Sequence, residues 1–540
     1  MRRFHSYGPV DCEEHFCVPR TELVQECLEH LVGHPDKGGH YFTIWAPRQT
    51  GKTWLMRQVQ ARLTREYEDR FLVGSMSMQG VVLKDNDPPE AFLDRVPRLF
   101  RDSLGFEVPQ PGTWAEWTDI FSTHTHILDR PIILFIDEFD SLPSQVIDQL
   151  VTLFRDMYLK RDSYLLHGLA LIGVRAVLGV GSGRGSPFNV QRSLQVPNLT
   201  REEVVELFHQ YEQESGQEVA DEVAEAVYTN TRGQPGLVGW FGELLTEKYN
   251  PGQGQTIGLE VWKQANHAAL HLEWNNTVLN LVKKAKDAYQ DKVAELFGNP
   301  ELAFSIDEDW CNYLYFNGII DSVTVTDANG LLRSYCIFSC PFVQHRLFNA
   351  FSNEVFDPKS ALVLHPLDDL ADVFAGEKLN LPALLQRYRD YLQRLEDKGL
   401  SPWAGQPRRS DLHLTEAVGH FHLYSWLRQA VEDQCMISPE FPTGNPDEMV
   451  LSEFHWASGK VDIFLRCGSA QGIIEIKSFE KQSKMKSYAE QAAHYAASLG
   501  LSGVTLAVFI PTREQEILDQ LSGELEIDQV VVHVMAIGWG

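Results

Sequence analysis

The stretch that decides the fold is Ala46-Pro47-Arg48-Gln49-Thr50-Gly51-Lys52-Thr53, which follows the apolar run Tyr41–Trp45 and opens a helical pattern over Thr53–Tyr67. A strand, a glycine-containing loop and a helix in this order predict a phosphate-binding loop, because backbone N–H groups and the helix N-terminus surround an anion. Lys52 would then reach the β- and γ-phosphates of a nucleotide, and the Thr53 hydroxyl would ligate Mg²⁺. Ala46 replaces the first glycine of the usual pattern, which is tolerable if that position needs no positive φ.

A second stretch, Ile132-Ile133-Leu134-Phe135-Ile136-Asp137-Glu138, completes this motif. It predicts a buried strand with two acids at its carboxyl end. Asp137 would hold Mg²⁺ through water, and Glu138 would orient and deprotonate the attacking water. The adjacent glutamate favours hydrolysis over phosphate transfer to a metabolite.

Strands and helices alternate over residues 1–250, which predicts an α/β fold with a parallel sheet covered on both faces. The acidic stretch after Thr200 predicts two amphipathic helices that close with Gly233-Gln234-Pro235-Gly236. The five expected strands are Tyr41–Trp45, Phe71–Met76, Pro131–Ile136, Leu169–Val174 and Leu194–Val196.

Residues ~10–250 resemble AAA-type ATPases of a STAND-like prokaryotic branch. The resemblance implies ATP as the ligand, a homo-oligomer, and adenine contacts from the segment Phe16–Glu22, which includes Pro19 and Arg20. It also implies a lid motif at Gly233-Gln234-Pro235 and a conformational loop at Ser186-Pro187-Phe188-Asn189. No arginine finger is assigned; the candidates are Arg175, Arg184 and Arg192.

The middle of the chain changes character. We expect a long helix over Thr277–Leu296, then a helix over Asp307–Phe316 and a hairpin whose turn is Asp327-Ala328-Asn329-Gly330. The hairpin strands are Ile319–Thr326 and Leu331–Phe338, and another helix starts at Pro341. This order is compatible with a winged-helix-like module, but we favour a packing adaptor that never touches DNA, because winged helices beside ATPase cores often only pack.

A second chemical motif lies near the C-terminus, in Gly459-Lys460-Val461-Asp462-Ile463 and Ile473-Ile474-Glu475-Ile476-Lys477. With a period of two, Glu475 and Lys477 share one face of a strand, and Asp462 lies beside Glu475 in a hairpin. Two carboxylates can hold one or two Mg²⁺ ions that polarise a phosphodiester, and the Ile476 carbonyl adds a ligand. Lys477 would position the attacking water and neutralise developing charge.

This pattern resembles the PD-(D/E)xK nuclease superfamily over ~130 residues, although Val461 stands where a proline often precedes the aspartate. The resemblance implies a further metal ligand, Glu416, and two helical site residues, Gln491 and Tyr495. It also implies DNA rather than RNA as the substrate and Mg²⁺, or alternatively Mn²⁺, as the ion. Three lysines extend a local positive patch that could contact phosphates, or could form a solvated loop: Lys481, Lys484 and Lys486.

The charge and composition of the chain limit its possible partners and its location in the cell. The net charge of −27 excludes broad attraction to nucleic acid or lipid, so a DNA contact must be local. No apolar run reaches the ~20 residues of a membrane span, and no secretory signal is present, so we expect a cytoplasmic protein with eight reduced cysteines.

Together these patterns predict five parts: an ATPase core (1–200), a helical lid (201–250), a helical and winged-helix-like module (251–352), connector helices (353–405) and a nuclease-like domain (406–540). The predicted function is ATP-controlled, Mg²⁺-dependent cleavage of DNA. Such joined modules imply prokaryotic defence against phage or mobile DNA. The alternatives are an oligomerising ATP switch whose nuclease-fold domain binds a nucleic acid or a partner without cutting, and an ATP-driven DNA motor.

Overall fold

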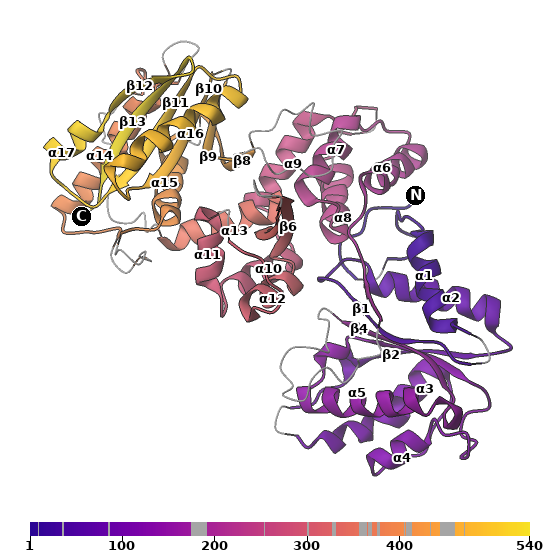
Figure 1. Ribbon diagram of the computed structural model, residues 1–540. Coiled ribbons are helices and arrows are strands. Elements are labelled where there is room, and N and C mark those ends of the chain that lie inside the picture. The colour runs from indigo at the N-terminus through magenta and orange to yellow at the C-terminus, as the bar shows by residue number, and fades with distance from the viewer. Residues whose placement is uncertain are drawn as a thin grey trace. The chain divides into compact units, whose positions relative to one another are not determined.

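The computed structural model divides the chain into two compact units (Figure 1). The first unit contains Met1–Lys284 and Ala303–Val343, and the second contains Ala285–Leu302 and Gln344–Gly540. Each unit is described by itself. The structure describes residues 1–8, 10–34, 37–84, 87–173, 192–252, 254–299, 302–326, 331–355, 364, 370–374, 379–403, 406, 413–431, 434–442, 460–468 and 470–539.

A five-stranded sheet in the order β2-β3-β4-β1-β5 forms the core of the first unit, and every neighbouring pair is parallel, as predicted. The phosphate-loop strand β1 and the acid-bearing strand β3 are therefore separated by one strand, β4. The strands span Tyr41–Trp45 (β1), Leu72–Ser77 (β2), Ile132–Asp137 (β3), Leu166–Gly173 (β4) and Arg192–Gln195 (β5).

Both faces of this sheet are covered because its strands are apolar throughout. Side chains of β3 alternate: Leu134 and Ile136 pack on one face, while Phe135 packs on the other. One face carries α3 (Val96–Leu104), α4 (Trp114–Asp119) and α5 (Ser144–Leu159), and the other carries α1 (Thr21–Val32) and α2 (Lys52–Tyr67). The phosphate-binding loop follows the carboxyl end of β1, and Asp137 stands at the carboxyl end of β3.

The predicted lid helices follow β5. The first begins with a reciprocal capping box, in which Thr200 accepts from the Glu203 backbone and the Glu203 side chain accepts from Thr200. The turn at Gly233 then leads into a third helix, which begins with a proline and was not predicted. The predicted lid range contains α6 (Arg201–Ser215), α7 (Asp221–Thr231), α8 (Pro235–Glu243) and a π-helical turn, and α9 (Leu259–His271) follows it.

The N-terminal segment docks on the lid. The Phe4 ring packs against the rings of Phe16 and Phe208, with centroids 5.2 and 4.9 Å apart. This approach needs glycines on α8, because a Cβ at Gly239 would lie 2.1 Å from the His5 carbonyl oxygen. The segment that leads to the predicted adenine contacts is thus anchored to the lid before it reaches the core.

The expectation of one long helix over Thr277–Leu296 is wrong. The chain instead forms α10 (Asn276–Ala285) in the first unit and α11 (Gln290–Gly298) in the second, so the break coincides with the division between units. In the second unit, Phe297 of α11 packs its ring 5.3 Å from that of Phe421. Helices α10 and α11 pack into different hydrophobic cores. A single amphipathic pattern in the sequence cannot reveal that division.

The hairpin after α12 (Asp309–Phe316) is confirmed. Strands β6 (Ile320–Thr326) and β7 (Leu332–Phe338) pair antiparallel, and α13 (Pro341–Val355) follows. The turn Asp327-Ala328-Asn329-Gly330 lies outside the described residues.

A six-stranded mixed sheet in the order β12-β13-β11-β10-β9-β8 forms the second unit. One face is covered by α16, and Gly419 of α15 contacts Phe509 on the other. The strands span Met436–Pro442 (β8), Lys460–Cys467 (β9), Ala470–Ser478 (β10), Gly503–Ile510 (β11), Gly523–Ile527 (β12) and Val530–Gly538 (β13). The helices are α14 (Leu381–Asp397), α15 (Glu416–Val431), α16 (Met485–Ser498) and α17 (Gln515–Leu521).

The expectation that all cysteines are reduced is wrong for four of them, because Cys12 pairs with Cys17 and Cys435 pairs with Cys467. Spacing in sequence gave no sign of the second pair, which joins residues brought together only by the pairing of β8 with β9. Within the described part of the chain, no helix is both long and apolar enough for a membrane span.

Replacing Gly239 tests the docking of the N-terminal segment. We expect Gly239→Ala to destabilise the protein by about 1–3 kcal/mol, because its new Cβ collides with backbone that cannot move independently. Hydrogen exchange should speed up in residues 2–6. Gly80→Ala is the matched control, since an added Cβ there meets nothing within 4 Å. Equal exchange in both variants would contradict the docking.

Candidate functional site

The phosphate-binding loop runs from the end of β1 to the start of α2. Gly51 has φ 90° and Gln49 has φ 58°, whereas Ala46 is not among the residues with positive φ, so the alanine is accommodated as the sequence required. Lys52 donates from Nζ to the carbonyl oxygens of Ala46 and Pro47, at 2.9 and 2.7 Å. Thr50 caps the loop by donating to the Pro47 carbonyl at 2.9 Å.

The acids at the end of β3 face this loop. The Thr53 hydroxyl donates to Asp137 Oδ2 at 3.0 Å, so the two predicted Mg²⁺ ligands are in direct contact. Glu138 follows with φ 53°, and its backbone N–H donates to Asp137 Oδ1 at 2.9 Å. A left-handed conformation at a non-glycine residue is uncommon and is held here by that hydrogen bond.

Burial shifts the pKa values of two groups at this site. It lowers the pKa of Lys52 to about 8, although Glu138, Asp140 and Asp137 oppose the shift. It also raises the pKa of Glu138, and the charges of Asp137 and Asp140 act in the same direction. A carboxylate with a raised pKa is a better proton acceptor, which suits the predicted role of Glu138.

The lid is hydrogen-bonded to the loop. Gln234 donates from Nε2 to the Arg48 carbonyl at 3.1 Å, and the Gly236 N–H donates to the Gln49 carbonyl at 3.1 Å. Pro235 lies between them as the first residue of α8. The predicted lid motif and the loop are therefore neighbours.

The predicted adenine-contact segment also reaches this region. The Arg20 guanidinium donates to the carbonyls of Pro197 and Asn198, at 2.8 and 3.0 Å, and pairs with Glu203 at 3.4 Å. Arg20 therefore ties the segment to the start of the lid, while the adjacent Pro19 is exposed. A contact of either residue with adenine stays a prediction.

Several predicted residues fall outside the described part of the chain: Arg175, Arg184 and the loop Ser186–Asn189. Arg192 belongs to β5, but its side chain is not described. The arginine finger therefore stays unassigned.

The C-terminal carboxylates meet where β9, β10 and α15 come together. Ile474 of β10 pairs with Ile463 of β9, and continuing this register sets Glu475 opposite Asp462. Asp462 Oδ2 accepts from the Ile476 N–H at 2.6 Å, which fixes that carboxylate against β10. Asp462 and Glu475 are thus side by side, as the hairpin predicted.

Lys477 sits among three carboxylates from three elements. Its Nζ lies 2.8 Å from Glu475 Oε1, 3.4 Å from Glu416 Oε1 and 3.9 Å from Asp462 Oδ2. It also donates to the Ile476 carbonyl at 3.0 Å. We call Glu416, Asp462, Glu475 and Lys477 the charged cluster. The sequence predicted these four residues together, but it did not predict the lysine at their centre.

Burial dominates the pKa values of the charged cluster. It raises the pKa of Glu475 to about 8 and that of Glu416 to about 7, and Lys477 opposes both shifts. Burial alone would lower the pKa of Lys477, but Glu475, Asp462 and Glu416 outweigh it and hold that pKa well above its ordinary value. Lys477 therefore keeps its charge.

Three residues that the sequence analysis missed hold the cluster in place. His420 contacts the Asp462 carbonyl through Nε2 at 2.8 Å, one helical turn after Glu416. Ser478 donates to the Leu414 carbonyl at 2.7 Å, and His413 contacts the Phe479 carbonyl at 2.8 Å. The spacing of four between Glu416 and His420 was a usable signal, because it places both on one helix face.

The other predicted nuclease-site residues lie on or before α16. Gln491 donates to the Tyr495 hydroxyl at 2.7 Å, and burial raises the pKa of Tyr495, with Glu475 and Lys477 both exerting an electrostatic effect. The charges of the cluster therefore act on the Tyr495 hydroxyl. Three lysines are exposed, and the last of them pairs only weakly with Glu490, at 3.7 Å: Lys481, Lys484 and Lys486.

The charged cluster is not a preformed metal cage. Over the described ranges, no three His, Cys, Asp or Glu residues are grouped so that they could hold a metal ion. The donor set nevertheless suits a hard divalent cation, since it consists of carboxylate and carbonyl oxygens. Glu475 Oε2 is buried and accepts no hydrogen bond from any described residue. The residues fit an ion only after some rearrangement.

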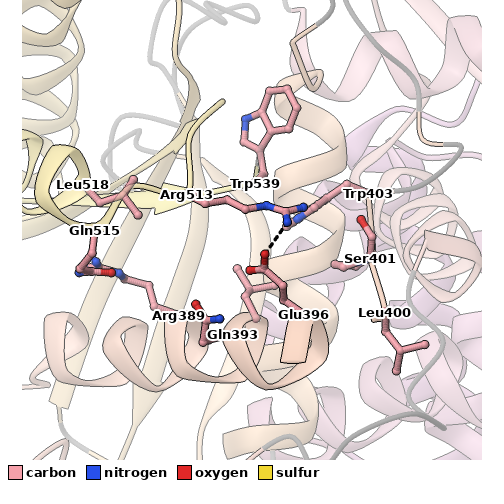
Figure 2. A pocket seen from close by; sticks show the side chains of 13 residues that line it. Arg389, Gln393, Glu396, Leu400, Ser401, Trp403, Arg513, Gln515, Leu518 and Trp539 are labelled. Atoms are coloured by element: carbon pink, nitrogen blue, oxygen red, sulfur yellow. Dashed lines mark hydrogen bonds and ion pairs between the residues drawn. The ribbon is translucent and has the colours of Figure 1, made fainter. Parts of the chain in front are cut away.

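Cavities lie elsewhere in the second unit. Figure 2 shows one of about 70 Å³ between α14 and the start of α17, with an ion pair between Arg513 and Glu396. No residue of the charged cluster lines this cavity. A larger cavity in the first unit, about 310 Å³, is lined by the phosphate-binding loop, Gln234 and Tyr315, among others.

Comparisons with known proteins match the N-terminal part of the chain. Residues 5–248 match the family model of an AAA-like domain. No curated protein matches the chain.

Three solved structures are similar at low identity. A Walker-type ATPase of Pyrococcus abyssi shares 16% identity with a TM-score of 0.43, covering 64% of this chain and 99% of that chain. The Thermotoga maritima RuvB Holliday junction branch migration motor shares 17% with a TM-score of 0.31, covering 56% and 89%. Drosophila ORC bound to DNA shares 14% with a TM-score of 0.35, covering 61% and 87%. The chain contains an AAA-like P-loop ATPase domain.

Proposed function

We propose that the protein is an ATP-hydrolysing, divalent-metal-dependent nuclease that cleaves DNA under the control of its nucleotide state. The observation that carries the nuclease half is the charged cluster, in which carboxylates from three elements surround one lysine. Prokaryotic defence, which the joined modules imply, is the biological setting we propose for this activity. The proposed assembly is a homo-oligomer formed through the ATPase domain.

The ATPase half follows from contacts around the loop. Backbone N–H groups at the start of α2 bind the phosphates, and Lys52 exchanges its carbonyl partners for phosphate oxygens. Thr53 and Asp137 would hold Mg²⁺, which neutralises phosphate charge when bound. Glu138 accepts the proton of the attacking water.

The nuclease half uses the chain's own charges in the same way. Asp462, Glu475 and the Ile476 carbonyl would hold the divalent ion, with Glu416 as an outer ligand, and the chemistry such an ion would supply is polarisation of the scissile phosphodiester. Lys477 positions the attacking water and offsets developing negative charge. The exposed lysines before and on α16 offer a local contact for phosphates despite the acidic net charge.

A second candidate is a nuclease-fold domain that binds nucleic acid or a partner without cutting. One observation favours it: Lys477 already compensates the carboxylates, so the charged cluster is stable without a metal ion. Cleavage assays separate the two candidates.

Neutralising Glu475 tests the nuclease. We expect Glu475→Gln to reduce Mg²⁺-dependent plasmid cleavage at least about a hundredfold while ATP hydrolysis is unchanged, because only the C-terminal ligand set is altered. Glu480→Gln, an exposed carboxylate on the same segment, is the control and should cut normally. Undiminished cutting by Glu475→Gln would remove this site, and absence of cutting by the parent protein would favour the docking domain.

Two substitutions test the ATPase. Lys52→Ala should abolish ATP binding, because it removes the ammonium that meets the phosphates. Glu138→Gln should bind ATP normally but lose hydrolysis at least about a hundredfold, because the amide cannot accept the proton. Binding is measured by calorimetry and turnover by phosphate release, with the exposed Glu90→Gln as the control. Parental turnover in Glu138→Gln would show that another group is the base.

The pKa of Lys52 predicts a pH dependence of ATP affinity. The phosphates bind the protonated amine, whose pKa of about 8 in the free site rises on binding. Affinity should therefore be full below pH 8 and fall by up to about tenfold per pH unit above it. Calorimetry between pH 7 and 9.5 measures this fall. Lys52→Arg should show no such fall, because the guanidinium stays charged, and a flat profile in the parent would refute the assignment.

A further inference from the structure

We propose that the charged cluster is a cation-exchange site, in which the Lys477 ammonium holds the position of the divalent ion until that ion displaces it. The inference rests on the proposed metal-dependent function of the same cluster and adds how the metal is admitted. It turns on the position of Lys477 relative to the oxygens that would ligate the metal.

The first step is the hydrogen-bonding of the ammonium. A lysine has three N–H donors, and three acceptors lie within 3.5 Å of Nζ: Glu475 Oε1, the Ile476 carbonyl and Glu416 Oε1. Two of these acceptors, Glu475 Oε1 and the Ile476 carbonyl, are oxygens that the proposed function assigns to the ion, and the third belongs to its outer ligand Glu416. The ammonium is therefore fully bonded at the centre of the ligand set.

The second step is geometric. Mg²⁺ binds its oxygen ligands at about 2.1 Å, and Nζ lies 2.8 Å from Glu475 Oε1, so an ion bound to that oxygen would lie within about 5 Å of the present position of Nζ. Two cations at such a separation also repel strongly in a poorly hydrated site. The ammonium in its present position therefore opposes the binding of an ion at these oxygens.

The third step concerns the second carboxylate oxygen of Glu475, Oε2, which has no hydrogen-bond partner among the described residues. Glu475 is 2% exposed. A buried carboxylate oxygen without a partner carries a desolvation cost. The ammonium cannot satisfy both oxygens of Glu475 and also reach Glu416. A divalent ion has more coordination positions and can bind both oxygens of Glu475 as well as Glu416. The unpartnered Oε2 of Glu475 therefore favours the exchange.

The exchange has a consequence for substrate. Once displaced, the ammonium lacks its carboxylate partners and needs another anion nearby, and a phosphodiester supplies one. Metal and nucleic acid should therefore bind with positive coupling, because each removes a cost of binding the other.

The test compares Mn²⁺ binding by nucleotide-free parent and Lys477→Met protein, using paramagnetic resonance to count bound ions. Removal of the competing ammonium should tighten Mn²⁺ binding at least tenfold and enlarge the rise in melting temperature on adding Mg²⁺. Lys398→Met, an exposed lysine of the same unit, should behave like the parent. Equal or weaker Mn²⁺ binding by Lys477→Met would overturn the exchange.

A second pair of variants covers the case in which Lys477→Met does not fold without metal. The single variant Glu416→Gln and the double variant Glu416→Gln/Lys477→Met differ only at Lys477. Both bury one carboxylate fewer than the parent protein. The double variant should bind Mn²⁺ at least tenfold more tightly than the single variant, and equal binding would overturn the exchange.

Glu475→Gln separates failure of the exchange from failure of the proposed function. Loss of Mn²⁺ binding in Glu475→Gln, together with equal binding by parent and Lys477→Met, would leave the metal site standing and overturn only the exchange. Unchanged Mn²⁺ binding in Glu475→Gln, or no binding by any variant, would overturn the metal site and the exchange together.

Discussion

Burying an ion is costly unless an opposite charge or several hydrogen bonds compensate it, and both candidate sites are organised by this constraint. In the first unit, the Lys52 ammonium rests on two backbone carbonyls, and Thr53 donates to Asp137. In the second, Lys477 rests on carboxylates and a carbonyl. Each site is thus compensated in the absence of ligand.

Sheet topology supplies the position of each site. In the first unit, the carboxyl ends of β1 and β3 lie at the same edge of a parallel sheet, with β4 between the two strands. In the second, β9 runs antiparallel to β10, so Asp462 near the start of β9 meets Glu475 near the end of β10. The acids of the two sites are therefore brought together by two different topologies, parallel in the first unit and antiparallel in the second.

Much of this could be predicted from sequence. Strand β1 begins and ends where the apolar run does, and the hairpin strands β6 and β7 lie within one residue of their expected bounds. Period-two alternation correctly set Glu475 and Lys477 on one face of β10. These features are local, so neighbouring residues determine them.

The remainder depends on contacts between distant residues. The break between α10 and α11 reflects two separate cores, and the Cys435–Cys467 pair depends on strand pairing. The position of Lys477 among three carboxylates depends on where α15 packs. A sequence pattern gives the residue types of such a cluster but not which charge lies at its centre.

The hydrogen bonds between the lid and the phosphate-binding loop have one more consequence. Gln234 and the Gly236 N–H hold the carbonyls of Arg48 and Gln49, which belong to the loop that surrounds the phosphates. The N-terminal turn of α8 cannot swing away without breaking these bonds or dragging the loop with it. Movement of the lid at this turn and rearrangement of the phosphate-binding loop are therefore coupled.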